Sequence, residues 1–251
     1  MMRFVLLDET GGVGTSQGEV LTPAILAHTA TVSTVYLNRD VSALWGGNYS
    51  VRAGAGAGDI QPGEIVFAVL PTLPNAPGAI AYHDSDGNGV PFAFDAITLS
   101  DTLIGPGNSL SVAITHELAE TAGDAGCNLW ADGADGSEYA HELCDAVEAQ
   151  TYSIDGVAVS NFVLPAFFTP GAAGPYDFMS AALLPGAVGP AKPFATVANG
   201  YQLVRTGGTG EHQVQAIQAE HTAAGGFGYR FAQRAAKRAH PDSRQSRRGL
   251  R

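Results

Sequence analysis

The sequence lacks long hydrophobic runs, and this absence excludes a membrane span. No stretch approaches the roughly twenty consecutive apolar residues that a membrane-spanning helix needs. The apolar run near the start, Phe-Val-Leu-Leu at residues 4–7, is too short for the hydrophobic region of a secretion signal. We therefore expect synthesis in the cytoplasm, no Sec-dependent export and no membrane partner.

Cysteine is equally scarce, with two residues, Cys127 and Cys144. Two cysteines cannot form the disulfide framework of a small secreted domain. They could pair with each other, but buried reduced thiols are the expected state in a cytoplasmic product. The chain is instead rich in glycine (32 residues) and proline (14 residues), which favours many turns over long helices.

Basic residues are few outside the C-terminal end of the chain. Residues 230–251 hold eight of the 13 Lys and Arg residues and one acid, a net charge of +7. The rest of the chain holds five bases and 23 acids, a net charge of −18. An acidic body repels nucleic acid and attracts cations, whereas a basic tail could contact nucleic acid or an acidic protein face.

The length and composition predict one large domain followed by a tail. The 251 residues, 45% of them hydrophobic, suffice for a folded core. We expect a domain over residues 1–225 and a flexible, basic tail over 226–251, because the tail has no apolar face to bury. Gly11-Gly-Val-Gly14 lacks the Lys-Ser/Thr of a phosphate-binding loop and predicts no nucleotide site.

The first half of the chain reads as strands around one packing helix. Apolar and β-branched runs predict strands at 3–7, 48–52 and 64–70, with a flexible glycine-rich connection at 53–58. Residues 21–37 predict a packing helix, since Pro23 is tolerated in a first helical turn. Residues 79–83 and 91–95 predict a hairpin. Residues 151–168 predict a second hairpin at Asp155-Gly156, and 194–204 a final strand region.

Asp84, Asp86 and Asn88, between residues 79–83 and 91–95, fit the first half of a calcium (Ca2+) loop, with Asp95 at its twelfth position. The strand-like flanks and Pro91 favour the other interpretation, a turn rich in Asp, Asn and Gly.

Residues 109–124 contain the pattern around which the chain is organised. Asn108 and Ser109 can cap a helix start, because a short polar side chain accepts the unpaired N–H groups of a first turn. Apolar residues then recur at helical spacing, at positions 110, 114 and 118. Gly123 can end the helix, since glycine adopts the left-handed conformation at a helix C-terminus.

This predicted helix contains three polar residues that can form a metal site. His116 and Glu120 are four residues apart and project from one face, where an imidazole and a carboxylate can hold one divalent ion. Glu117 is rotated by about 100° from His116 and would lie beside the ion, where a general base for water must sit.

Catalytic zinc takes three protein ligands and a water, so a third ligand is needed. Glu142 and Asp145 lie downstream, after an acidic loop at 124–138, and are the leading candidates. Asp124 is a further option if the helix continues past Gly123, because it would share the face of the two helical ligands. His141 is expected to be a surface histidine rather than a ligand.

The stretch His116-Glu-Leu-Ala-Glu120 resembles the active helix of the zincin metallopeptidases, H-E-x-x-H, with glutamate in place of the second histidine. Residues 175–180, Pro-Tyr-Asp-Phe-Met-Ser, resemble the methionine-containing turn of the metzincin branch. Gly123 matches the glycine of the metzincin signature, whereas Gly126 stands at its third ligand. The resemblance implies an α+β, zincin-like fold: a mixed sheet, an N-terminal packing helix and a central helix that binds zinc (Zn2+).

A wider resemblance joins 116–120, 142–148 and 162–165 to uncharacterised proteins of tailed bacteriophages, and it spans roughly residues 20–205. Three hypotheses follow. The chain is a metal-dependent peptidase with Glu117 as its base, acting on a protein or peptide; or it is an inactive, zincin-like structural protein among other proteins of a virion; or it binds nucleic acid through residues 230–251. We rank the third last, because the aromatic residues in or next to this segment are Tyr229 and Phe231 and the body of the chain is acidic.

The state of Glu117 discriminates the first two hypotheses. A structural site needs no general base, so the Glu117 carboxylate would then be engaged in a salt bridge or turned away from the ion.

Overall fold

The computed structural model describes residues 1–73, 76, 78–208 and 211–218, so the basic tail predicted at 226–251 lies outside the described residues. The described chain is a mixed α+β structure with few helices and a mixed sheet, as predicted. The helices are α1 (Pro23–Val35), α2 (Ser42–Trp45), α3 (Leu110–Asp124) and α4 (Phe178–Ala181). The strands are β1 (Met2–Asp8), β2 (Tyr49–Ala53), β3 (Glu64–Leu70), β4 (Ala81–Ser85), β5 (Pro91–Ala96), β6 (Trp130–Asp132), β7 (Ser137–Ala140), β8 (Thr151–Ile154), β9 (Val157–Ser160), β10 (Tyr201–Gly208) and β11 (Glu211–Gln218).

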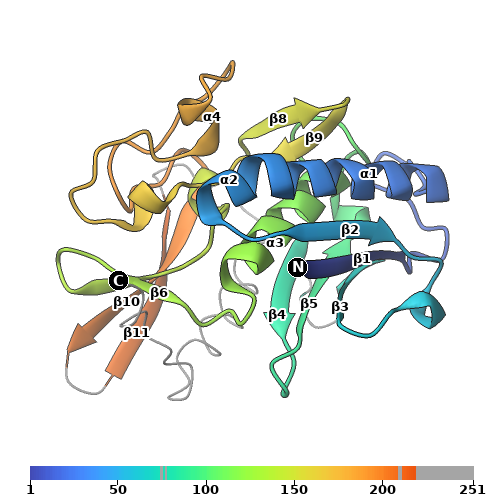
Figure 1. The fold of residues 1–251 in the computed structure, drawn as a ribbon, viewed down its shortest axis with the longest axis horizontal. Helices are drawn as coiled ribbons and strands as arrows, with labels where there is room; N and C mark the ends of the chain where they lie inside the picture. The colour runs from blue at the N-terminus through green and yellow to red at the C-terminus, as the bar shows by residue number, and fades with distance from the viewer. Residues whose placement is uncertain (74–75, 77, 209–210, 219–251) are drawn as a thin grey trace.

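A five-stranded sheet forms the base of the molecule, in the order β2-β1-β3-β5-β4 (Figure 1). The first four strands of this order run parallel, and β4 pairs antiparallel with β5, with which it forms the predicted hairpin. Parallel strands need crossover connections, and α1 supplies the one between β1 and β2. The antiparallel β4 is therefore the edge strand on the side of the sheet away from β2.

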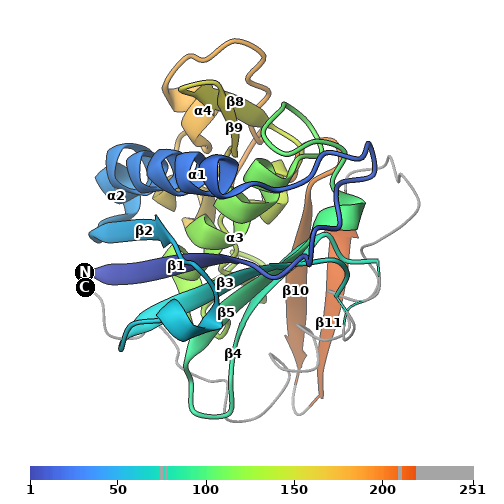
Figure 2. The same ribbon diagram turned by 90° about the vertical axis from the view of Figure 1, so that its right-hand side faces the viewer.

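Helices α1 and α3 lie on one face of this sheet, as Figures 1 and 2 show together. Alternation along β1 sets that face: Phe4 and Leu6 enter the main core with both helices, while Val5 and Leu7 enter a smaller cluster on the opposite face. Helix α1 starts as predicted, because the Thr22 hydroxyl accepts the N–H of Ile25 and a proline occupies the first turn. It continues through a π-helical turn, Tyr36–Val41, into α2.

The second half of the chain adds smaller β elements. Strands β8 and β9 form the hairpin predicted at Asp155-Gly156, whose two turn residues both have positive φ (49° and 78°). A four-stranded antiparallel sheet has the order β11-β10-β7-β6. The predicted acidic loop at 124–138 is wrong in part, because β6 and the start of β7 fall within it. The predicted final strand region contains only the first residues of β10, and β11 had no counterpart in the prediction.

The connection at 53–58 was expected to be flexible, but side chains hold its ends together. The guanidinium of Arg52 donates to Glu64 at 2.7 Å and to Asp59 at 2.7 Å, and Asp59 also accepts the N–H of Ala55 at 3.0 Å. A single arginine thus ties the loop to the start of β3.

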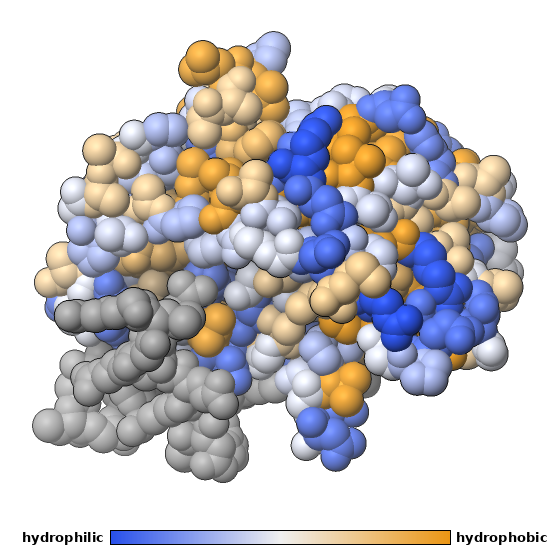
Figure 3. All heavy atoms as spheres, in the orientation of Figure 1, coloured by the Kyte–Doolittle hydropathy of each residue, from blue (hydrophilic) through white to orange (hydrophobic). Residues whose placement is uncertain are grey.

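The surface of the described residues mixes polar and apolar side chains (Figure 3). Apolar atoms gather on the projection next to α4, where Leu183 is 89% exposed and Val188 is 67% exposed. Among the described residues, no helix combines the length and the apolar character that crossing a membrane requires.

The prediction that the helix ends at Gly123 is wrong, because α3 continues through this glycine to Asp124. Glycine is required at position 123 for another reason, which is close packing. A Cβ built on Gly123 would lie 2.8 Å from Cδ1 and Cγ of Leu143, and Leu143 is fully buried. Only glycine therefore allows the segment around Leu143 to pack directly against the helix.

We expect Gly123→Ala to destabilise the protein by about 1–3 kcal/mol, the usual cost of overpacking a core. In a helix with open space the same change would stabilise by roughly 0.5–1 kcal/mol, because alanine is the better helix former. Urea unfolding of the wild type, Gly123→Ala, Leu143→Ala and the double variant provides the measurement. The cost of Gly123→Ala should shrink in the Leu143→Ala background, and equal costs in both backgrounds would contradict the packing argument.

Candidate metal centre

Helix α3 is enclosed between the five-stranded sheet and strand β9, which it contacts on opposite sides. Its N-terminus is capped as predicted, with the Ser109 hydroxyl accepting the N–H of Val112. Two further hydroxyls fix it to β9: Ser111 donates to the carbonyl of Ala158 at 2.7 Å, and Thr115 accepts the N–H of Ser160 at 3.0 Å. The polar face of α3 is thereby held in the interior.

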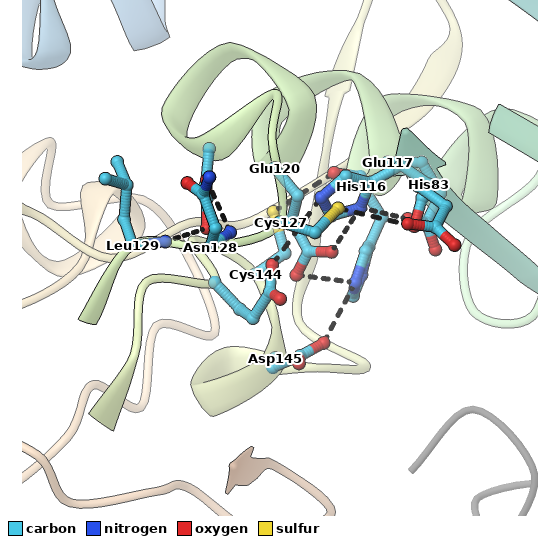
Figure 4. Close-up of polar contacts among 12 residues, drawn as sticks. His83, His116, Glu117, Glu120, Cys127, Asn128, Leu129, Cys144 and Asp145 are labelled. Atoms are coloured by element: carbon cyan, nitrogen blue, oxygen red, sulfur yellow. Dashed lines mark hydrogen bonds and ion pairs between the residues drawn. The ribbon is translucent and has the colours of Figure 1, made fainter. Parts of the chain in front are cut away.

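The first metal-capable group joins the helix to a downstream turn (Figure 4). His116 Nε2 lies 3.1 Å from Glu120 Oε1 and 3.2 Å from Asp145 Oδ1, and all three residues are buried. A single N–H cannot donate fully to two acceptors at once, whereas one metal ion can bind all three atoms. Ligands bound tetrahedrally to zinc at about 2.0–2.1 Å lie about 3.3 Å apart, close to the observed distances.

Asp145, one of the two leading candidates for the third ligand, thus lies beside the two helical residues. It starts a short 3-10 turn, Asp145–Val147, 29 positions after His116, and the β6–β7 hairpin lies between the two residues in the sequence. The other candidate, Glu142, belongs to a second metal-capable group with His83 and again Glu120, in which one ligand atom of each residue lies within 4.8 Å of the others.

His83 was missed by the sequence analysis, although its strand was predicted. It lies on β4 with 1% exposure, and its ring reaches the polar face of α3. His83 Nδ1 lies 2.9 Å from Glu117 Oε2 and 3.4 Å from Glu120 Oε2, while Nε2 lies 3.8 Å from Glu142 Oε2. The available signal was alternation, because Ala81 and His83 occupy the inward positions of an edge strand.

The pKa values near the cluster show how strongly it concentrates negative charge. Burial opposes a charge on His116, but the carboxylates of Glu120 and Asp145 outweigh burial and raise the pKa of the imidazole well above its ordinary value. Burial, reinforced by Glu120, raises the pKa of the Cys144 thiol well above its ordinary value. Cys144 belongs to neither of the two metal-capable groups found among the described residues.

Both cysteines are free and buried, as expected for reduced thiols, and each contacts the backbone of one histidine of the cluster. The thiol of Cys144 donates to the carbonyl of His116, and the thiol of Cys127 donates to the carbonyl of His83, both at 3.7 Å. The two thiols thus help to hold the backbone of β4 at His83 and the backbone of α3 at His116.

Asp124 does not join the metal-capable groups, although α3 extends far enough to include it. Its carboxylate accepts the N–H groups of Asn128 at 3.1 Å and Leu129 at 2.9 Å, which ends the helix and turns the chain. Asp86 has the same kind of role in the β4–β5 turn, where its Oδ1 accepts the N–H groups of Asn88 and Val90. This supports the turn interpretation of the possible calcium loop.

Two other expectations concern residues around the cluster. His141 was expected at the surface, which is wrong: it is 1% exposed, stacked on Phe168 and edge-on to Trp45. Met179 is buried, and its N–H donates to Asn161 Oδ1 at 3.1 Å. The position of Met179 beneath a metal, implied by the metzincin resemblance, stays a prediction.

A pocket of about 190 Å³ gives access to the cluster from the side of His116. Its wall contains apolar side chains, backbone of the loop before α3, and one carboxylate, that of Glu148. The lining residues are Ile80, Gly107, Asn108, Ser109, Val112, Ala113, His116, Glu148, Ala149 and Ser160. A molecule entering this pocket would therefore meet His116 first, whereas Glu117 and Glu120 have no exposed surface.

We expect Asp145→Asn to weaken zinc affinity by more than the roughly 10–100-fold typical of losing an outer-shell partner, because Asp145 supplies a ligand atom. Asp124→Asn is the matched control, a buried acid near the cluster that binds backbone amides. It should cost about 1–3 kcal/mol of stability and leave zinc affinity unchanged. Competition titrations with a chromophoric chelator measure both affinities, and equal weakening by the two substitutions would contradict the assignment of Asp145.

Comparisons with known proteins do not assign the chain to a family. No protein-family model matches it, and neither a curated protein nor a solved structure does. The zincin and bacteriophage resemblances of the short motifs therefore stay predictions, and the functional argument rests on the geometry of the cluster and its pocket.

Proposed function

We propose that this protein is a metal-dependent hydrolase of the zincin type, with peptides as its substrate class. The observation that carries the proposal is the position of His116, which is both a member of a metal-capable group and a wall of an open pocket. A purely structural ion is normally closed off by its ligands, whereas a catalytic one keeps a position accessible to water or substrate.

The ion would be held by His116, Glu120 and Asp145, and zinc suits this nitrogen and oxygen ligand set. Bound there, a divalent ion would polarise a substrate carbonyl and lower the pKa of a water. The two carboxylate ligands donate more negative charge than two histidines would, which weakens that polarisation. A slow or highly specific hydrolase is therefore expected rather than a general one.

An extended peptide is the favoured substrate because of the strand beside the pocket. Strand β4 is the edge of its sheet, and edge strands can bind a peptide through backbone hydrogen bonds. Ile80, which directly precedes β4, lines the same pocket as His116. A peptide added to this edge would pass close to the mouth of the pocket.

The proton acceptor is assigned to Glu148 in this proposal, not to Glu117. Glu148 is partly exposed and lines the pocket with His116, so it can take a proton from a water there. Glu117 is fully buried, and its Oε2 lies 2.9 Å from His83 Nδ1. If Glu117 is not the general base, its carboxylate is expected to be engaged in a salt bridge, and His83 is the residue in position to form one.

A second candidate function, a structural metal centre without catalysis, is favoured by the same Glu117–His83 contact. A protein of this kind would bind its ion permanently and show no chelator-sensitive chemistry. It would suit the alternative drawn from the bacteriophage resemblance, an inactive structural protein of a virion.

We expect zinc-loaded protein to cleave unstructured protein substrates, and chelation of the metal or His116→Ala to abolish this cleavage. Glu148→Gln should lower turnover by about 10²–10⁴-fold, the usual worth of a general base, without changing zinc content. If Glu117→Gln instead loses turnover by this factor while keeping its full zinc content, Glu117 is the general base and the assignment of Glu148 is wrong. If no substrate is cleaved in a chelator-sensitive way, the hydrolase proposal is contradicted and the structural metal centre is the remaining candidate.

A further inference from the structure

Three carboxylates and two histidines of the cluster form two overlapping metal-capable groups that share one residue. His116 and Asp145 belong to one group, His83 and Glu142 to the other, and Glu120 to both. We propose that the cluster binds two divalent ions at the same time, with the carboxylate of Glu120 bridging them. This proposal rests on the metal centre of the proposed function and adds a second ion to it.

The orientation of Glu120 is the first argument for the bridge. Its Oε1 lies 3.1 Å from His116 Nε2, and its Oε2 lies 3.4 Å from His83 Nδ1. The two oxygens of one carboxylate thus face two different histidines, from α3 itself and from β4 (Figure 4). One ligand atom of each of His83, Glu120 and Glu142 also lies within 4.8 Å of the others, so the carboxylate of Glu120 is within reach of an ion in either group.

The ring of His83 supplies the second argument. Its Nδ1 is within hydrogen-bonding distance, 2.9 Å, of Glu117 Oε2, so a proton on Nδ1 is donated to that carboxylate. In the neutral ring with its proton on Nδ1, Nε2 carries the lone pair that can bind an ion, and it lies 3.8 Å from Glu142 Oε2. This distance is long for a hydrogen bond, but two atoms bound to one ion at about 2.1 Å can lie up to about 4.2 Å apart.

Glu117 thereby becomes a positioning residue. Histidines that bind metals almost always donate their other ring N–H to a carboxylate, which fixes the tautomer and the orientation of the ring. The Glu117–His83 pair has this arrangement, entirely buried, with both side chains at 0% exposure. The two neighbouring residues His116 and Glu117 would then act on different ions. His116 would bind the first ion, and Glu117 would orient His83, which binds the second.

Charge balance supplies the third argument. The cluster holds four buried carboxylates, those of Glu117, Glu120, Glu142 and Asp145. Two imidazoles supply at most two positive charges, and one divalent ion with neutral histidines likewise supplies two. Two divalent ions supply four, which matches the carboxylates and removes the large cost of burying net charge.

The basic residues of the described chain lie in other parts of the structure. Three are arginines in ion pairs: Arg39 with Asp40, Arg52 with Asp59 and Glu64, and Arg205 with Glu138. The Arg3 guanidinium donates to the carbonyl of Pro62, and Lys192 is exposed. Within the described part of the chain, bound cations would therefore be the counter-charge for the cluster.

Zinc titration with native mass spectrometry tests the second ion directly, because it counts ions per folded chain without any need for activity. The wild type should bind two zinc ions in the cluster, and His83→Ala and His116→Ala one each. Glu117→Gln keeps the shape of the side chain and should weaken one of the two ions by about 10–100-fold, leaving the other unchanged. His141→Ala, a buried histidine outside both groups, is the control and should keep two.

The outcomes separate the two proposals. A wild type that binds one ion, with His83→Ala also binding one, would overturn the second ion and leave the proposed function standing. A wild type that binds none would overturn both. If His83→Ala fails to fold, judged by circular dichroism, Glu117→Gln decides: zinc affinities identical to wild type at both ions would contradict the positioning of His83 by Glu117.

Discussion

The structure depends on the burial of four carboxylates beneath and along one helix. Glu117, Glu120, Glu142 and Asp145 are between 0% and 4% exposed and lie close together in the interior. Burying uncompensated charge costs far more free energy than a domain has to spare. Positive charge at the centre of the cluster removes this cost, and two protonated histidines would supply half of what four ionised carboxylates require. Metal binding and folding are therefore expected to be coupled in this chain.

The fold brings three distant segments to this point. Strand β4 contributes His83 from the edge of the sheet, α3 contributes three residues, and the segment before β8 contributes Glu142 and Asp145. Each segment is fixed by contacts that have no other evident purpose. Gly123 admits Leu143 against the helix, two thiols hold the backbone at the histidines, and Thr115 ties α3 to β9. Contacts thus hold all three segments at the cluster, and a pocket reaches it on the side of His116.

Much of the local structure could be predicted from the sequence, because its signals are local. The Ser109 cap, Pro23 in a first turn, and the Asp155-Gly156 hairpin each act within a few residues, and all three were confirmed. The expected end of α3 at Gly123 was wrong because its cause is a contact with Leu143, twenty positions away. His83 was missed for the same reason: only the packing of β4 on α3 shows that its strand faces the cluster. The pairing of His116 with Asp145 rather than Glu142 depends on the turn at 145–147, which has no distinctive local pattern.

The central claim is that the buried cluster is a metal centre, and anomalous diffraction at the zinc edge tests it most directly. Crystals of the zinc-loaded protein should show one anomalous peak bonded at about 2.0–2.2 Å to His116 Nε2, Glu120 and Asp145. A second peak should lie between Glu120, His83 Nε2 and Glu142, on the opposite oxygen of the shared carboxylate. Zinc bound elsewhere on the chain, with the cluster held together by protons alone, would contradict the account.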